Sequence, residues 1–442
     1  MLPKIIDLFS GCGGLALGFE KKGFDIAAGI ELAPDACQTV SYNLDYRYGR
    51  EQTHLCADIT KTDAAIFKDR FGAEGCIVIG GPPCQAYSIA GMAKLRSLGE
   101  YRVNTMDKRG FLYKSFLKYV YDLDAKAVVM ENVPQSTSYG DLNIPEIVCR
   151  NLGKHGYSAF WTILNSADYG VPQLRERVFV IGVKRELGIE ISLPEPTHKS
   201  KDNYQTANQK RLDSFRESRH FKHPLSDDNA SKYWVSVKDA LSDLPELFPT
   251  YDSKYRLAKL NEELDYRTEP QNEFQYQMRN WYGMESMGVT ANAFRNNRYF
   301  KIFSMMKQGD DYVDASRIAD ELFAQEAKIF GYKPGTPEYE KLQKKMVPIY
   351  ARDKFDSKWF RIEEDRPCHT LVAHLSKDTY SHIHPTEPRG ISVREAARIQ
   401  SFPDDFFFDC NMGDAYKQIG NAVPPLLAMA VAESLLNAFK EK

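Results

Sequence analysis

The chain has 442 residues, about three times the usual length of one domain, which predicts two or three domains. Hydrophobic residues make up 43% and charged residues 27% of the chain, a globular composition that excludes global disorder. The 58 Lys and Arg residues nearly balance the 60 Asp and Glu residues, so the net charge of −2 does not by itself indicate nucleic acid as a partner.

Targeting and redox signals are also absent from the sequence. No uninterrupted apolar run approaches the ~18 residues that a membrane span requires, and the N-terminus lacks the pattern of a signal peptide. The eight cysteines are scattered without a CxxC pair. Such spacing favours a reducing cytoplasm over a disulfide framework. We therefore expect a cytoplasmic protein with no membrane partner.

Residues 1–185 alternate between short apolar runs and helical patterns. The sequence predicts strands at residues 4–10, 25–31, 54–59, 76–81 and 127–133, and helices at 15–23, 35–44 and 111–123. Two further runs, 161–170 and 177–184, follow each other closely and predict an antiparallel pair that closes the sheet. This alternation predicts an α/β fold built on a doubly wound, mostly parallel sheet.

The character of the sequence changes after Arg185. Residues 186–232 are polar, basic and interrupted by prolines, and the chain up to about residue 360 shows no βα alternation. A helical pattern returns at 392–402, and residues 421–439 predict an apolar helix that needs a core to pack on. We therefore predict a first domain of residues 1–185 plus 420–442, with a second domain of residues 186–419 inserted into it.

A glycine-rich turn, DLFSGCGG, joins the first predicted strand to the first helix. Glycines at such a turn let the backbone and a helix N-terminus approach a ligand closely. Glu31 and Asp58 lie at the ends of the next two predicted strands, at the same edge of the sheet. Nucleotide-binding folds use an acidic residue at this edge to bind the ribose hydroxyls. The pattern indicates an adenosine compound, although a tight turn with ordinary solvated acids gives the same pattern.

A second turn, GGPPCQAYS, follows the fourth predicted strand. Its glycines and prolines fix the backbone and present Cys84 at a strand end, which is typical of a nucleophile. The next strand ends at Glu131, close enough to act on whatever Cys84 attacks, and a carboxyl group in a closed pocket can hold a proton at neutral pH. Taken alone, Glu131 is better explained as a solvated acid at a strand end, but beside Cys84 the catalytic interpretation is favoured.

The alternating residues Gln173, Arg175 and Arg177 share one face of a strand, which suits binding of a phosphate or a carbonyl oxygen. Five potential metal ligands also gather within 17 residues: Cys368, His369, His374, His382 and His384. Their irregular spacing and the lack of a second cysteine argue against zinc. We expect no metal, and core or DNA contacts for these histidines.

Taken together, the motifs resemble those of the DNA (cytosine-5)-methyltransferases. DLFSGCGGLALGFE, GGPPCQAYS, MENV, QLRERVFVIG, SVREAARIQSFP and YKQIGNAVPP occur in the order of that family. The resemblance implies a methyltransferase fold, S-adenosylmethionine as methyl donor, double-stranded DNA as substrate, and a target recognition domain between QLRER and REAARIQ. It also implies a bacterial, nucleoid-associated enzyme, usually a monomer, of a restriction–modification or other defence system, with a cognate nuclease or other defence proteins as partners.

The resemblance also implies roles for single residues. Catalysis would rest on Cys84 as nucleophile, Glu131 as its partner, and Arg175 and Arg177 around the flipped cytosine. The cofactor would be bound by Phe9, Ser10, Gly11, Gly13, Gly14, Leu15, Glu31, Asp58, Ile59, Pro83, Leu112, Asn421 and Val423. DNA would be contacted by Gln85, Ser88, Arg109 and Gln173, with residues 85–109 as a lid over the flipped base. In the insert, Arg295, Asn297 and Arg298 suit base edges.

Two alternatives use the same motifs. A tRNA cytosine-5 methyltransferase would carry a Cys-Phe-Thr motif and a small recognition domain, and this chain has neither. A catalytically silent DNA-binding regulator would typically have lost the cysteine or the glutamate, yet Cys84 and Glu131 are both present. The basic stretch 199–222 is either a solvated surface loop or a phosphate contact.

Overall fold

The computed structural model describes residues 2–83, 112–140, 142–201, 209–247, 259–295, 299–348, 358–377 and 379–440. The chain forms two compact units. The first unit comprises Met1–Trp234, Gln400–Phe402 and Asn421–Lys442, and the second comprises Val235–Ile399 and Pro403–Gly420.

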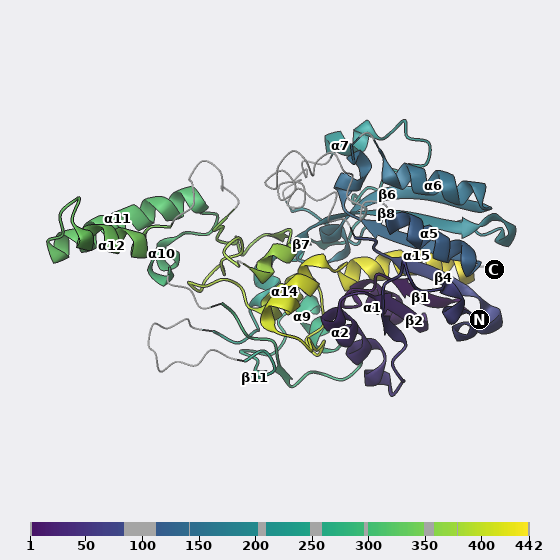
Figure 1. The fold of residues 1–442 in the computed structure, drawn as a ribbon, viewed down its shortest axis with the longest axis horizontal. Helices are drawn as coiled ribbons and strands as arrows, with labels where there is room; N and C mark the ends of the chain where they lie inside the picture. The colour runs from purple at the N-terminus through teal and green to yellow at the C-terminus, as the bar shows by residue number, and fades with distance from the viewer. Residues whose placement is uncertain are drawn as a thin grey trace. The chain divides into compact units, whose positions relative to one another are not determined.

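A seven-stranded sheet forms the centre of the first unit (Figure 1). Its strands are β1 (Lys4–Leu8), β2 (Ile26–Glu31), β3 (His54–Cys56), β4 (Cys76–Gly80), β5 (Ala127–Asn132), β6 (Tyr157–Asn165) and β8 (Glu176–Lys184). The order is β3-β2-β1-β4-β5-β8-β6, with β1 to β5 parallel and β8 antiparallel to both of its neighbours. The predicted α/β fold, its mostly parallel sheet and the closing antiparallel pair are confirmed.

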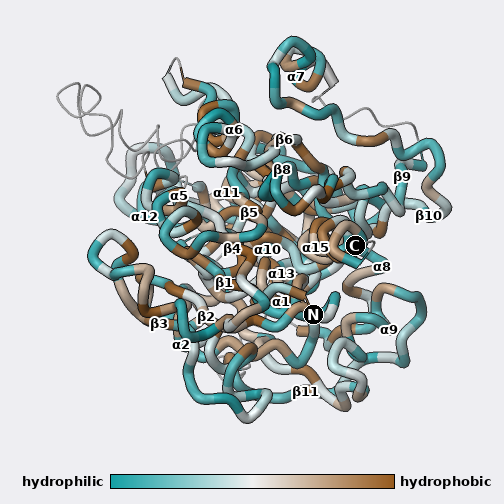
Figure 2. Tube along the Cα trace, turned by 90° about the vertical axis from the view of Figure 1, so that its right-hand side faces the viewer, coloured by the Kyte–Doolittle hydropathy of each residue, from teal (hydrophilic) through white to brown (hydrophobic). Residues whose placement is uncertain are grey.

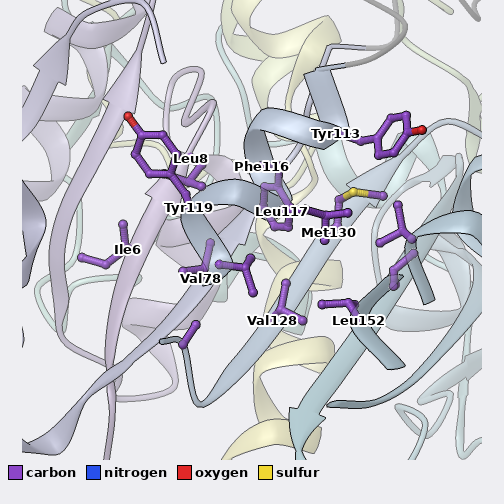
Figure 3. Close-up of a cluster of buried hydrophobic side chains, with 14 of the residues drawn as sticks. Ile6, Leu8, Val78, Tyr113, Phe116, Leu117, Tyr119, Val128, Met130 and Leu152 are labelled. Carbon is purple, nitrogen blue, oxygen red and sulfur yellow. The ribbon is translucent and has the colours of Figure 1, made fainter. Parts of the chain in front are cut away.

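Helices on the sheet complete the core of the first unit. They are α1 (Gly14–Lys21), α2 (Pro34–Leu44), α5 (Leu112–Asp122), α6 (Ile144–Lys154), α7 (Gln209–Ser214) and α15 (Pro425–Lys440). Figure 3 shows Phe116 and Leu117 of α5 directed at Val78, Val128 and Met130 of the central strands, all at most 4% exposed. In Figure 2 the central strands and α15 are predominantly hydrophobic, which explains why buried parallel strands appear in the sequence as continuous apolar runs.

Helix α15 returns to the first unit from more than 400 residues away and packs on α1 (Figure 1). Lys22, just after α1, pairs with Glu433 of α15 at 2.8 Å. Among the described residues, the stretch Met412–Lys440 is long and apolar enough to cross a membrane, judged by length and composition alone. Of its most apolar window, 61% is buried within the protein, as is typical of a core helix.

The contact between α1 and α15 depends on Gly18. A Cβ atom at this position would lie 2.4 Å from the Cβ of Ala428 and 2.7 Å from the backbone of Pro425 and Met429. Because backbone atoms cannot move aside cheaply, Gly18→Ala is expected to lower the free energy of unfolding by about 1–3 kcal/mol. Gly153→Ala in α6, where the nearest atom lies at 3.6 Å, should instead raise it by about 0.5–1 kcal/mol. Urea denaturation of both variants tests the pair, and equal effects would contradict it.

The first continuous segment of the first unit extends beyond the predicted boundary at residue 185 and runs to Trp234. The reason is that the polar segment after β8 remains hydrogen-bonded to the sheet edge. Trp161 of β6 donates its backbone N–H to His220 and accepts from Lys222, and the ring of His220 contacts Glu146 at 2.7 Å. Two short strands, β9 (His198–Lys199) and β10 (Lys232–Tyr233), pair in parallel within this segment.

Asp168, which follows β6, is a half-buried acid in the first unit. Its Oδ1 accepts hydrogen bonds from Trp234 Nε1 at 2.9 Å and from Asn165 Nδ2 at 3.3 Å. Burial raises its pKa from an ordinary value of 3.8 to about 7, because the charged form is desolvated. The folded state therefore holds a proton that the unfolded state releases between these two values, and stability should fall as the pH rises through this window.

Asp168→Asn should remove that pH dependence. The amide keeps an acceptor for Trp234 but is never charged, so the variant should be more stable than the wild type at about pH 8, with a difference that shrinks towards about pH 5. Urea denaturation at both pH values measures the effect. The exposed Asp213→Asn serves as control, and parallel pH profiles for wild type and Asp168→Asn would contradict the assignment.

The second unit has a core of its own. Its elements are α8 (Val237–Leu241), β11 (Leu264–Asp265), α9 (Glu273–Arg279), β12 (Gly288–Val289), α10 (Phe300–Met305), α11 (Tyr312–Phe330), α12 (Pro337–Met346), β13 (Cys368–His369), α13 (Val393–Ile399) and α14 (Met412–Asn421). Trp359 is fully buried at its centre and contacts the rings of Tyr299, Phe303, Tyr312 and Tyr380 at centroid distances of 4.5–5.7 Å.

Candidate active site

The glycine-rich turn between β1 and α1 depends on left-handed backbone conformations. Phe9, Gly11 and Gly13 have φ values of 58°, 55° and 90°, a region that favours glycine. Phe9 is half-buried against the sheet core. A Cβ atom on Gly14 would lie 2.4 Å from the carbonyl oxygen of Val423, so the turn packs against the chain that enters α15. Two predicted cofactor segments are therefore in contact.

Glu31, at the end of β2, is fixed beside this turn by two backbone donors. Its Oε2 accepts from the N–H of Gly11 and its Oε1 accepts from the N–H of Ala33, both at 2.8 Å. Asp58, beyond β3, accepts from the backbone N–H of Thr60 at 2.9 Å and from its hydroxyl at 2.7 Å, and these bonds lower the pKa of Asp58. The edge therefore presents two oriented carboxylates to a ligand.

Asp7 is an acid in the same region that the sequence reasoning missed. It lies within β1, is 1% exposed, and its Oδ2 has no hydrogen-bond partner among the described residues. Burial and the charge of Glu31 raise its pKa well above the usual range. Ser10 orients the turn by donating from its hydroxyl to the carbonyl oxygen of Asp7 at 2.8 Å. An acid inside an otherwise apolar strand was the available signal.

Glu131 and Arg177 form an ion pair at the ends of β5 and β8. Arg177 Nε lies 2.8 Å from Glu131 Oε1, and the two side chains are only 11% and 10% exposed. Burial raises the pKa of Glu131 despite the opposing charges of Arg177 and Arg175. A carboxyl group whose pKa is raised keeps its proton to a higher pH than an ordinary glutamate does, and it can deliver that proton to a bound group. The pairing supports the predicted neighbourhood of these residues.

Arg175 is completely buried, and two of its hydrogen bonds connect parts of the scaffold. Its Nη2 donates to the carbonyl oxygen of Ala422 at 3.0 Å and its Nη1 to Gln173 Oε1 at 3.4 Å. Gln400 joins the same network, because its Oε1 accepts from Gln173 at 2.5 Å and its Nε2 donates to Ala422 at 2.6 Å. The sequence reasoning missed Gln400, although it lies in the quoted motif REAARIQ. Contact of Arg175 or Gln173 with substrate stays a prediction.

The turn that leads to Cys84 is anchored to the strand that carries Glu131. Strands β4 and β5 pair in parallel, and Asn132 Nδ2 donates to the carbonyl oxygen of Pro82 at 3.2 Å. A Cβ atom at Gly81 would lie 2.8 Å from Glu131 Oε2, so the turn passes close to that carboxylate. Asn132 is therefore a further residue that the sequence reasoning missed, although it adjoins Glu131. Cys84, Gln85, Ser88 and Arg109, with the predicted lid, lie outside the described residues.

Comparison with known proteins decides the family. The model of the C-5 cytosine-specific DNA methylase family matches residues 3–437. This chain belongs to that family. Its members are the DNA (cytosine-5)-methyltransferases, and methylation of cytosine in DNA is the activity that the motifs predicted. The two alternative functions, a tRNA methyltransferase and a catalytically silent regulator, are not favoured.

Known relatives match this chain over nearly its full length. The chain is 52% identical over 440 residues to the "Putative type II methyltransferase M.OihORF3336P" of Oceanobacillus iheyensis, covering 98% of this chain and 95% of the relative. It is 29% identical to the type II methyltransferase M.AgeI of Thalassovita gelatinovora, over 98% and 99% of the two chains. A solved structure titled "putative DNA modification methyltransferase", encoded within an E. coli prophage, shares the fold with a TM-score of 0.65 at 23% identity over both full chains.

The other residues assigned to this methyltransferase from the motifs are spread over several elements. Leu15 and Ile59 are buried, Pro83 and Leu112 are half-buried, and Asn421 is exposed at the end of α14. In the second unit Arg295 donates to the carbonyl oxygen of Ser376. Asn297 and Arg298 lie outside the described residues. The DNA contacts assigned to these three residues stay predictions.

Proposed function

We propose that this chain transfers a methyl group from S-adenosylmethionine to C5 of a cytosine rotated out of duplex DNA, through a covalent bond between Cys84 and C6. The observation that carries this proposal is the buried Glu131–Arg177 ion pair beside the anchored turn that leads to Cys84. It brings a carboxyl group with a raised pKa to the strand end next to the cysteine turn. Base rotation is required because the reacting edge is inaccessible within a duplex, at a cost of a few kcal/mol.

The residues have complementary tasks in this reaction. Cytosine C5 is a poor nucleophile, so electron density must be supplied to the ring. Attack of the Cys84 thiolate on C6 forms the C–S bond and moves the C5–C6 π electrons to C5, while protonation of N3 by Glu131 stabilises the adduct. After C5 has gained the methyl group, loss of its proton to a base restores the double bond and expels the thiolate. Arg177 orients Glu131 throughout.

The first unit suits the cofactor. S-adenosylmethionine supplies an electrophilic methyl group on a sulfonium centre. Glu31, held by two backbone donors, would accept hydrogen bonds from the ribose hydroxyls, and the half-buried ring of Phe9 would stack on the adenine. Asp58 and Ile59 would contact the adenine edge. The unpartnered Oδ2 of Asp7 behind the turn supports a polar ligand at this edge.

The second unit would form the target recognition domain, and the enzyme would act as a monomer on double-stranded DNA. Because relatives carry names of type II methyltransferases, we place the chain in a restriction–modification system. Its partner would be a nuclease that cuts the same sequence when it is unmethylated. The site of action would be the bacterial cytoplasm, at the nucleoid.

Bisulfite sequencing of DNA from cells that express the wild-type chain tests the function. We expect methylated cytosine at one short sequence, and none when Cys84→Ser is expressed at the same level. Methylation that persists in Cys84→Ser would overturn the covalent mechanism. Unmethylated DNA in cells with folded wild-type protein would overturn the DNA substrate.

A further inference from the structure

Two cysteines that are distant from the predicted nucleophile meet beside the strand end that carries Glu31. Cys37 lies on α2 and Cys56 ends β3, and a side-chain hydrogen bond joins the two thiols. Both are free thiols; Cys37 is 1% exposed, whereas Cys56 is exposed to solvent. The proposed methyl transfer uses neither residue.

Hydrogen bonds from both elements hold the two thiols in this arrangement. Cys37 donates from Sγ to the carbonyl oxygen of His54 at 3.5 Å, and Gln52 Nε2 donates to Cys37 Sγ at 3.7 Å. His54 and Cys56 are two residues apart on β3, so their side chains share one face of the strand, and α2 packs against β3. Formation of a disulfide requires only that the hydrogen-bonded sulfurs close to about 2.05 Å.

The cysteine pair belongs to the edge that carries the cofactor carboxylates. In the register of β2 and β3, Glu31 lies directly opposite Cys56, and Asp58 follows two residues later. Ala33, whose N–H orients Glu31, accepts a backbone hydrogen bond from the N–H of Cys37 at 2.9 Å. A change in the distance between the two sulfurs therefore acts on the backbone that positions these carboxylates.

We propose that Cys37 and Cys56 form a reversible disulfide when the protein meets a hydroperoxide, and that this bond weakens the binding of S-adenosylmethionine. The second half of the inference rests on the proposed function, and the first half does not. In a reducing cytoplasm the pair remains a dithiol, so the disulfide marks oxidative conditions.

The exposed thiol reacts first. Burial raises the pKa of Cys37 to about 12, which leaves it a poor first nucleophile. The Cys56 thiolate attacks the peroxide, the O–O bond breaks, and Cys56 becomes a sulfenic acid while the other oxygen leaves as water or an alcohol. The Cys37 sulfur then attacks the Cys56 sulfur. The S–S bond forms, the S–O bond breaks, and hydroxide leaves with the thiol proton as water. The two thiols thus supply the two electrons that reduce the peroxide.

Peptide mapping of the full-length protein by mass spectrometry tests the bond. After treatment with hydrogen peroxide we expect a peptide pair linked through Cys37 and Cys56, which dithiothreitol separates. The linked pair should be absent from Cys56→Ser, a change at an exposed position that the fold tolerates. It should persist in Cys84→Ser and in Cys410→Ser, which alter thiols elsewhere.

Calorimetry with S-adenosylmethionine tests the coupling to the cofactor edge. The oxidised wild type should bind about tenfold more weakly than the reduced protein, the loss expected when one hydrogen bond to a charged group is weakened. Dithiothreitol should restore the affinity. Cys56→Ser should show the same Kd before and after peroxide, and Cys84→Ser should respond as the wild type does.

Three results have distinct meanings. The absence of the linked peptide, or oxidation of Cys56 to a sulfinic acid without the link, would overturn the disulfide. A linked protein that binds S-adenosylmethionine with unchanged affinity would overturn the coupling. Failure of the reduced wild type to bind S-adenosylmethionine would instead contradict the proposed function, and the peptide map would still decide the bond.

Discussion

Glu131→Gln is expected to slow methyl transfer by about 10²- to 10⁴-fold, the usual contribution of a positioned acid or base. The amide cannot deliver a proton to N3, and it leaves the guanidinium of Arg177 without its carboxylate at an 11% exposed position. Because burial raises the pKa of Glu131, the wild-type rate should fall as the pH rises through that pKa, and the variant should lack this limb. Single-turnover transfer of labelled methyl groups measures both effects.

Cofactor affinity separates this effect from damage to the fold. Glu31 and the glycine-rich turn belong to other strand ends, so Glu131→Gln should bind S-adenosylmethionine with the wild-type Kd in calorimetry. Glu433→Gln is a matched control, because Glu433 also forms a 2.8 Å ion pair, with Lys22, but is 53% exposed and remote from the sheet edge. A methyl-transfer rate of Glu131→Gln within tenfold of the wild-type rate would contradict the catalytic role of this carboxyl group.

Arg398→Ala is expected to cost the second unit about 3–5 kcal/mol of folding free energy, the typical effect of removing one partner from a buried ion pair. Arg398 on α13 is completely buried between two carboxylates. It donates to Asp243 at 2.9 and 3.1 Å, to Asp404 at 2.5 Å twice, and to the carbonyl oxygen of Ala240 at 2.8 Å. Asp243 keeps Arg279 as a partner, but the buried Asp404 loses its bidentate guanidinium.

Urea denaturation, followed by circular dichroism and by hydrogen exchange of α13, measures the loss. Arg317→Ala is the matched control, since Arg317 on α11 is 59% exposed and forms a 2.9 Å pair with Glu321 one turn away. Such surface pairs contribute about 0.3–0.5 kcal/mol. Equal losses for the two variants would show that the buried cluster is not a stabilising element.

The fold of the first unit could be predicted because its determinants are local. Strands such as β4, whose five residues are all buried, appear as unbroken apolar runs between glycine turns and helical patterns. Right-handed βαβ connections then bring the carboxyl ends of the strands to one edge. Glu31 and Glu131 therefore lie at that edge in the structure as the sequence indicated.

The second unit could not be predicted in the same way because its contacts are distant in the sequence. Asp243 and Arg398, 155 residues apart, form a buried pair that no spacing pattern reveals. Helix α11 is not among the predicted helices, because its buried face is rich in small residues such as Ala315 and Ala319. Helix α12 buries none of its described residues, and Thr336 caps its first turn.

The packing of α15 on α1 has a consequence for synthesis of the chain on the ribosome. Lys22 and Glu433 are 411 residues apart, and at ~5–20 residues per second a ribosome needs about 20–80 s to make the intervening chain. Throughout this interval the apolar residues of α1 that α15 covers, around Gly18, have no native partner. The nascent first unit is therefore a candidate client for chaperones, and it acquires its complete fold only when translation has passed residue 440.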